Sequence, residues 1–210
     1  MKVLRLTTKL QLTLAALAFA LTTGCASSTS VVVEADFPTV VYEPRDIRAA
    51  VVFEPAFREY IAQPTADVLI DIGGAQVDLL SNAFDGLFEQ VEYPASREAV
   101  DPDTELVIVP SVQQVQMSTP SDSYLNVYEV WIKYSLDIET GDGVPVDSWF
   151  MPAYGKTPDS LLLSRSKAIR EAALIALRDA GAKLLLDFYR IPAIYGWMQQ
   201  EGRLEEADSS

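Results

Sequence analysis

The chain has 210 residues, with 30 acidic and 16 basic side chains and no histidine, so its formal net charge at neutral pH is −14. A surface of this sign repels nucleic acid and is not drawn to anionic lipid, which excludes a nucleic-acid-binding role. The absence of histidine removes Ser-His and Cys-His nucleophilic machinery and the commonest transition-metal ligand. Sites built only from Ser, Lys and carboxylates remain possible, but none of the candidates below is favoured, so we expect no metal, no cofactor and no enzymatic activity.

The first residues predict an export signal. Three basic residues and no acid occupy the first nine positions, and an apolar to weakly polar run at 12–21 follows, which is the order of a secretory signal. This run is shorter than the roughly 20 residues that a membrane-spanning helix needs, so we expect no permanent transmembrane segment.

The only cysteine follows this run directly. The stretch Leu21-Thr22-Thr23-Gly24-Cys25 resembles a bacterial lipobox, with the leucine four rather than three positions before the cysteine. The resemblance implies cleavage between Gly24 and Cys25 and acyl chains on the cysteine, and Ala26 as the next residue implies transfer to the periplasmic face of the outer membrane. Several acyl chains anchor a protein stably, whereas one is marginal. The alternative is an ordinary signal peptide cut elsewhere, beside a chance cysteine.

The rest of the chain is large enough for one domain. Without residues 1–24 it has 186 residues, with 13 basic against 30 acidic side chains and a net charge of −17. We divide the chain into a signal peptide at 1–24, a lipid-anchored tether and extended arm at 25–47, an α+β domain at 48–192, and a short amphipathic segment with an acidic tail at 193–210.

Strands and one helix alternate in the first half of the domain. Short strands are predicted at 49–53 and 66–72, and a helix of about four turns follows Gly73-Gly74 because apolar residues recur there at helical spacing. These residues are Val77, Leu80, Phe84, Leu87 and Phe88. A strand near Val91, a loop at 97–105 and a strand at 106–117 come next.

The clearest pattern is a half-buried antiparallel hairpin. Apolar and polar residues alternate from Tyr128 to Glu139, and a three-residue loop at 141–143 leads into the returning strand at 144–150. The predicted register places Ile138 opposite Val146, Tyr134 opposite Phe150, and Asp137 opposite Asp147. The last of these pairs is unfavourable, because like charges face each other.

A long helix is predicted to begin near Asp159, behind the start signal Thr157-Pro158, and to end before Pro192. Its apolar stripe is rich in alanine, which allows close approach to a sheet. The stripe consists of Leu162, Ile169, Ala173, Ala176, Ala180, Leu184 and Phe188.

This order of elements predicts an α+β two-layer sandwich, with an antiparallel sheet of four to five strands and two helices packed on one face. Behind a lipobox, the order at 66–190 resembles small Gram-negative envelope lipoproteins of the LptE-like, YajG-like and ABC-transport-auxiliary types. The resemblance implies an accessory role in lipid or lipopolysaccharide transport.

Three patterns in the sequence are catalytic or metal-binding candidates. The segment 164–167 has the S-x-x-K spacing of penicillin-recognising enzymes, but "SDS" at 121–123 and "GKT" at 155–157 precede it rather than follow it. Asp137 and Glu139 share a strand face at about 6–7 Å, near the spacing of an inverting glycosidase pair. The acids at 101–105 alternate as at the start of a calcium loop, without its glycine and distal glutamate. We interpret all three as solvated surface.

Two features are better suited to binding. In the predicted register an apolar strip faces away from the helices and marks a protein-partner site, unless the arm at 31–47 buries it. The strip consists of Leu125, Val127, Trp131, Trp149 and Met151. Basic residues gather at the start of the long helix and could hold a lipid phosphate, the alternative being a solvated helix face with Lys167 paired to Glu171. They are Lys156, Arg165, Lys167 and Arg170.

The sequence therefore favours a non-enzymatic, outer-membrane-anchored lipoprotein that serves as an accessory or assembly subunit of an envelope complex. Its expected partners are an envelope protein and, through Cys25, the membrane itself. The alternative is a module that binds a small ligand, lipid or cell-wall component in a pocket between sheet and helices.

Overall fold

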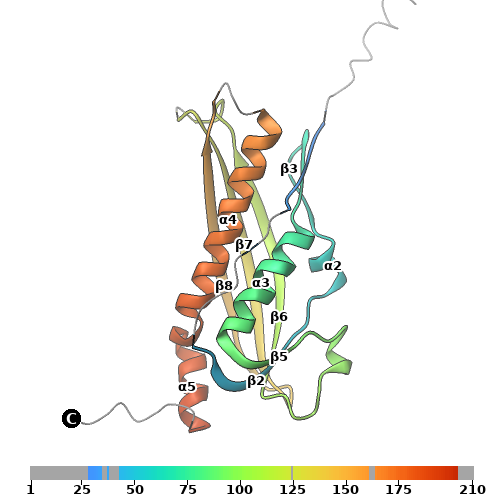
Figure 1. Cartoon of the computed structure of the whole chain (residues 1–210), viewed down its shortest axis with the longest axis vertical. Coiled ribbons are helices and arrows are strands. Elements are labelled where there is room, and N and C mark those ends of the chain that lie inside the picture. Colours follow the sequence, from blue (N-terminus) through green and yellow to red (C-terminus); the bar gives the residue numbers. More distant parts are fainter. Residues whose placement is uncertain (1–27, 35–36, 38–42, 124, 161–163, 203–210) are drawn as a thin grey trace, which may run out of the picture.

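The computed structural model describes residues 28–34, 37, 43–123, 125–160 and 164–202 (Figure 1). The predicted signal peptide, lipobox and acidic tail lie outside these residues. The first half of the described chain contains β1 (Thr29–Val32), β2 (Arg45–Val51), α2 (Pro55–Arg58), β3 (Ile61–Thr65), β4 (Val68–Asp71), α3 (Gly73–Leu87) and β5 (Phe88–Glu92). The second half contains a 3-10 turn (Arg97–Ala99), β6 (Leu106–Ser118), β7 (Val127–Thr140), β8 (Pro145–Pro158), α4 (Arg165–Asp187), a 3-10 turn (Phe188–Arg190) and α5 (Pro192–Gln200).

The α+β class is confirmed, but the strands form two sheets rather than one. A five-stranded sheet has the order β5-β2-β6-β7-β8, and a three-stranded sheet has the order β1-β4-β3. The larger sheet is mixed, because β2 runs parallel to both β5 and β6. Parallel neighbours need a long crossover connection, and the segment between β2 and β5, which includes α3, supplies it.

Both ends of the predicted arm at 31–47 belong to the two sheets. Residues 29–32 pair as β1 with β4, and residues from Arg45 onward pair as β2 in the middle of the larger sheet. The uninterrupted small and apolar run at 49–53 suits a strand with neighbours on both sides and cover on both faces.

Helices α3 and α4 cover one face of the larger sheet (Figure 1), and their apolar sides share a single core with it. The predicted core positions of β7 all lie in this core, as do Leu80, Phe84 and Leu87 of α3. Within the described residues, no helix is long and apolar enough to span a membrane.

The β7-β8 hairpin has a register different from the predicted one. Thr140 does face Val144, whose carbonyl accepts its N–H at 2.8 Å, but the register then shifts by one residue at Val146. Asp137 therefore lies opposite Ser148, whose hydroxyl donates to it at 2.7 Å, and not opposite Asp147. The shift replaces a repulsive pair of carboxylates by a hydrogen bond, and it reverses the two faces of β8.

Helix α4 begins later than predicted. Strand β8 continues to Pro158, and the helix begins at Arg165 after the N-cap residue Ser164. The Ser164 hydroxyl oxygen accepts the Lys167 N–H at 3.4 Å, so this S-x-x-K spacing is a helix cap. Leu162 of the predicted stripe lies outside the described residues, while Ala173, Ala176 and Ala180 are buried as predicted.

One buried polar network joins the helical layer to the sheet. The Tyr134 hydroxyl on β7 donates to Gln76 Oε1 on α3 at 3.1 Å, and Gln76 Nε2 donates to the Phe57 carbonyl at 2.6 Å. Both Tyr134 and Gln76 are fully buried. Burial raises the pKa of the Tyr134 phenol, and burial together with a hydrogen bond to Asp85 raises the pKa of Tyr93.

We expect the free energy of unfolding to fall as the pH rises above about 10, the ordinary tyrosine pKa. Above that pH the unfolded chain releases the two phenolic protons, whereas the folded chain keeps them, so the stabilisation present at lower pH is lost. Urea denaturation between about pH 8 and 12 measures this decline. In a Tyr134→Phe variant the decline should be shallower, and an identical decline would contradict the assignment to Tyr134.

Candidate functional site

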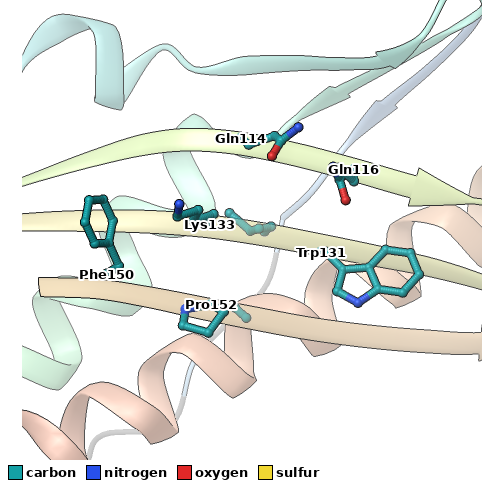
Figure 2. Close-up of a pocket in the computed structure, with 8 residues that line it drawn as sticks. Gln114, Gln116, Trp131, Lys133, Phe150 and Pro152 are labelled. Atoms are coloured by element: carbon teal, nitrogen blue, oxygen red, sulfur yellow. The ribbon is translucent and has the colours of Figure 1, made fainter.

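A strip of aromatic and polar side chains occupies the face of the larger sheet that points away from α3 and α4 (Figure 2). Side chains alternate along β7 and β8, so every second residue of each strand lies on this outer face. Trp131 and Phe150 remain 37% and 54% exposed there. Eight residues line a shallow depression of about 320 Å³, and two of them, Ile132 and Ala153, are buried. The other six are called the outer strip below: Gln114, Gln116, Trp131, Lys133, Phe150 and Pro152.

The rings of the outer strip are held by contacts between β7 and β8. The centroids of Trp131 and Tyr154 lie 5.2 Å apart, and the Lys133 ammonium lies 4.6 Å from the centroid of Phe150. The Tyr154 hydroxyl donates to Glu129 at 2.6 Å, and this hydrogen bond raises the pKa of Tyr154. Side chains that are already ordered lose less conformational freedom on binding.

The structure corrects two of the five predicted partner-binding residues. Met151 is completely buried against Tyr134, and Trp149 is partly buried against the same core, because the extra residue at Val146 reverses the faces of β8. Phe150 takes their place on the outer face. The sequence contained a signal for the different register, because the predicted register placed Asp137 opposite Asp147, which is an unfavourable pair of like charges.

The other three predicted residues lie away from the core to different degrees. Trp131 belongs to the outer strip and is drawn at one end of it in Figure 2. Val127 is half-buried at the start of β7, and Leu125 is 62% exposed in the connection between β6 and β7. Of the predicted apolar strip, Trp131 and Val127 therefore remain on the sheet, and the exposed Leu125 lies beyond the end of β7.

The described part of the N-terminal segment leaves the outer strip open. Strand β1 pairs with β4 in the smaller sheet, and β2 lies between β5 and β6. Another outer patch, at the other end of β6, is covered instead. Val107 and Val109 pack there with Ala50 and Val52, and Val100 from the loop at 93–105 lies over them.

The edge of β8 is closed to further strands. The Tyr154 N–H donates to Asp179 of α4 at 2.9 Å, and Lys183 of α4 donates to the Pro152 carbonyl at 2.6 Å. Asp179 and Lys183 also pair with each other at 2.7 Å. Pro152 and Pro158 are an even number of residues from Tyr154, so their backbone nitrogens point to the same side of β8 as the Tyr154 N–H. Proline has no N–H, so these two positions offer no hydrogen-bond donor at this edge. Blocked edges resist strand addition, which leaves the outer face as the accessible part of the hairpin.

The structure does not bring the four predicted anion-binding residues together. Arg165 pairs with Asp67 at 2.9 Å, and hydrogen bonds from Thr65 and Arg165 lower the pKa of Asp67. Gly155 lies against α4, so the next residue, Lys156, projects from the opposite face of the sheet. Lys167 and Arg170 remain exposed on α4.

The acidic candidates have structural partners. Arg97 pairs with both carboxylate oxygens of Glu139 at 2.8 Å, and Asp137 accepts from Ser148. Asp101 accepts the Asp103 N–H at 2.8 Å, as in a solvated turn. No group of three or more His, Cys, Asp or Glu side chains that could hold a metal is present in the described part of the chain.

Comparison with family models gives no match, and comparison with curated proteins gives none either. Among solved structures, the fold is similar to that of a candidate neuraminyllactose-binding hemagglutinin homologue from Helicobacter pylori, with a TM-score of 0.50, 14% identity, and coverage of 83% of this chain and 100% of that one. A candidate lipoprotein from Caulobacter crescentus has a TM-score of 0.41 and 12% identity, over 73% of this chain and 91% of its own. Uncharacterized lipoprotein B from Nitrosomonas europaea has a TM-score of 0.40 and 10% identity, over 78% and 93%. At 14% identity, the similarity to the Helicobacter pylori protein concerns the fold alone.

Proposed function

We propose that this chain is a lipid-anchored protein of the bacterial outer membrane that holds a protein partner on the outer strip. It is a non-enzymatic accessory or assembly subunit of an envelope complex, attached through acyl chains on Cys25. The lipobox resemblance at 21–25 supports the anchor, and Ala26 supports the outer membrane as its destination.

The observation that carries the proposal is the outer strip itself. Exposed aromatic rings with polar side chains beside them are typical of residues that contribute strongly to binding energy at protein interfaces. Trp131 and Phe150 meet this description, with Gln114 and Gln116 beside them. The closed edge of β8 directs a partner to the face rather than to the strand edge.

The setting that we propose is lipid or lipopolysaccharide transport. It rests on the resemblance to LptE-like and ABC-transport-auxiliary lipoproteins, which share a lipid anchor and this order of elements. The acidic surface favours an accessory role over direct binding of a broad anionic lipid surface, because like charges repel.

A pull-down from gently solubilised native envelopes tests the protein partner. The lipidated protein is compared with a Trp131→Ala, Phe150→Ala double variant, and bound proteins and lipids are identified by mass spectrometry. We expect one stoichiometric membrane protein whose recovery the double variant loses. Tyr195→Ala is the matched control, because Tyr195 is an exposed aromatic residue on α5.

Equal recovery by the wild type and the double variant would refute the outer strip as the interface. Loss of the partner from the Tyr195→Ala control as well would show that the effect is not specific to this face. Circular dichroism and urea denaturation of each variant show whether the fold is kept, since both substitutions are at exposed positions.

A second candidate function is the binding of an envelope glycan. Flat aromatic rings beside side-chain amides are suited to a sugar, and the depression of about 320 Å³ is lined by Trp131, Gln114 and Gln116. This places a ligand on the outer face and not between sheet and helices, where the core is filled. Recovery of glycan or lipid without protein in the same pull-down would favour this candidate.

A further inference from the structure

The described chain has two ends that differ in charge, and the anchor is tied to one of them. In Figure 1 the start of α4, the β3-β4 turn and the β6-β7 connection lie at the upper end of the molecule. The β7-β8 turn and the loop at 93–105 lie at the other end, where the Gly141 N–H donates to the Glu105 carbonyl. Strand β7 alone separates the two ends by roughly 45 Å.

A hydrogen bond and an ion pair, both made by Asp67, join the segment that follows Cys25 to the upper end. The Thr29 N–H donates to the Asp67 carbonyl at 2.6 Å, and the Asp67 side chain pairs with Arg165 at 2.9 Å. Cys25 is four residues before Thr29, so its Cα is at most about 14 Å from that of Thr29, whatever path the chain takes. An acylated Cys25 therefore holds the start of α4 close to the membrane surface.

The upper end carries the groups that suit a phospholipid surface. Lys167 and Arg170 are exposed on the first turns of α4, and Lys156 is exposed at the end of β8. Leu125 is 62% exposed in the neighbouring connection. Asp67, Asp122 and Asp159 are acids on the connections at this end, and Arg165 pairs with Asp67, so this end is close to neutral in a strongly acidic protein.

The opposite end is acidic. The residues in and beside the 93–105 loop and the β7-β8 turn include Glu98, Asp101, Asp103, Glu139, Asp142 and Asp147. Arg48 and Arg97 are the bases among them, and they pair with Asp103 and Glu139. An anionic membrane attracts basic residues close to its surface and repels acidic ones, so the charge distribution and the short tether favour the same orientation.

We propose that the upper end of the domain docks on the phospholipid headgroups of the membrane that holds the anchor, with Lys167 and Arg170 contacting the phosphates and Leu125 facing the headgroup layer. This inference rests on the proposed acylation of Cys25. In this orientation the long axes of α4 and β7 point away from the membrane. The outer strip then lies near the membrane surface, and the acidic end of the domain projects away from the membrane.

Fluorescence quenching at the two ends tests the orientation. The lipidated chain carries a fluorophore at Leu125→Cys or at Val144→Cys, which are matched because Val144 is an exposed apolar residue at the β7-β8 turn. The chain is reconstituted in vesicles of phosphatidylethanolamine and phosphatidylglycerol that contain a lipid with a nitroxide headgroup. We expect quenching at position 125 to be several-fold stronger than at position 144.

A charge reversal tests the basic residues. Lys167→Glu with Arg170→Glu should reduce the quenching at position 125, whereas Arg178→Glu with Arg190→Glu, an equal charge change at exposed residues farther along the chain, should leave it unchanged. Unchanged quenching in the first pair would overturn the phosphate contacts.

The failures of the two proposals are distinguishable. Mass spectrometry and flotation with the vesicles report whether Cys25 carries acyl chains, and a chain without them refutes the proposed anchor and this inference together. A lipidated chain that floats but is quenched equally at both positions, or more at position 144, overturns the orientation alone.

Discussion

Gly155→Ala is expected to lower the free energy of unfolding by about 3 kcal/mol, the upper end of the usual cost of overpacking. Gly155 lies on the inner face of β8, where α4 approaches the sheet. A Cβ placed there would be 2.1 Å from the Ala172 carbonyl oxygen and 2.4 Å from the Ala176 amide nitrogen. These are backbone atoms of a buried helix, so the clash can be relieved only by moving α4 away from the sheet.

Urea denaturation of residues 26–210 measures this effect. Gly196→Ala on α5 is the matched control, because no atom lies within 4 Å of its added Cβ and its φ is not positive. In a helix this control should stabilise by about 0.5–1 kcal/mol. A Gly155→Ala variant as stable as the wild type would show that α4 does not pack against β8 as closely as described.

The same close approach shows how far the sequence could predict this fold. The alanines at 173, 176 and 180 indicated a helix that lies close to a sheet, and every second residue of β7 from Tyr128 to Ile138 is apolar and buried, so both were predicted correctly. In β8, apolar residues occur at both parities, because Trp149, Phe150 and Met151 are consecutive. A strand of this kind fits two registers, and only the bulge at Val146 decides between them.

The start of α4 was misplaced for a related reason. Pro158 looked like a helix start, but on an edge strand a proline removes only a donor that has no neighbour to bond. The true start has a signal of its own in the cap formed by Ser164. Trp131 could be assigned to the outer face because β7 alternates, whereas Phe150 could not, because its face depends on the bulge.

The parallel strands were the part of the fold that the sequence concealed. Residues 45–47 were assigned to the arm, because Arg45 and Asp46 are charged and prolines precede them. The partners of β2 in β5 and β6 are about 40 to 60 residues away in the chain, and such pairings follow from the packing of the whole domain rather than from local pattern. The smaller sheet, in which β1 pairs with β4, was missed for the same reason.

Gln76→Ala is expected to cost about 3–4 kcal/mol, because it leaves two buried polar groups without partners and opens a cavity between α3 and β7. Gln76 is fully buried, and its side-chain amide satisfies both the Phe57 carbonyl and the Tyr134 hydroxyl. No water can replace the amide without entering the core. Tyr134→Phe removes only one of these hydrogen bonds, so we expect it to cost about 1–2 kcal/mol.

A double-mutant cycle in urea denaturation measures the coupling between the two side chains. Because they share a hydrogen bond, the combined variant should be less destabilised than the sum of the single variants, by about 1 kcal/mol. Gln199→Ala, an exposed glutamine on α5, should change stability by less than about 0.5 kcal/mol. Strict additivity of Gln76→Ala and Tyr134→Phe would mean that this hydrogen bond contributes nothing to holding α3 against the sheet. The orientation of the helical layer would then depend on apolar packing alone.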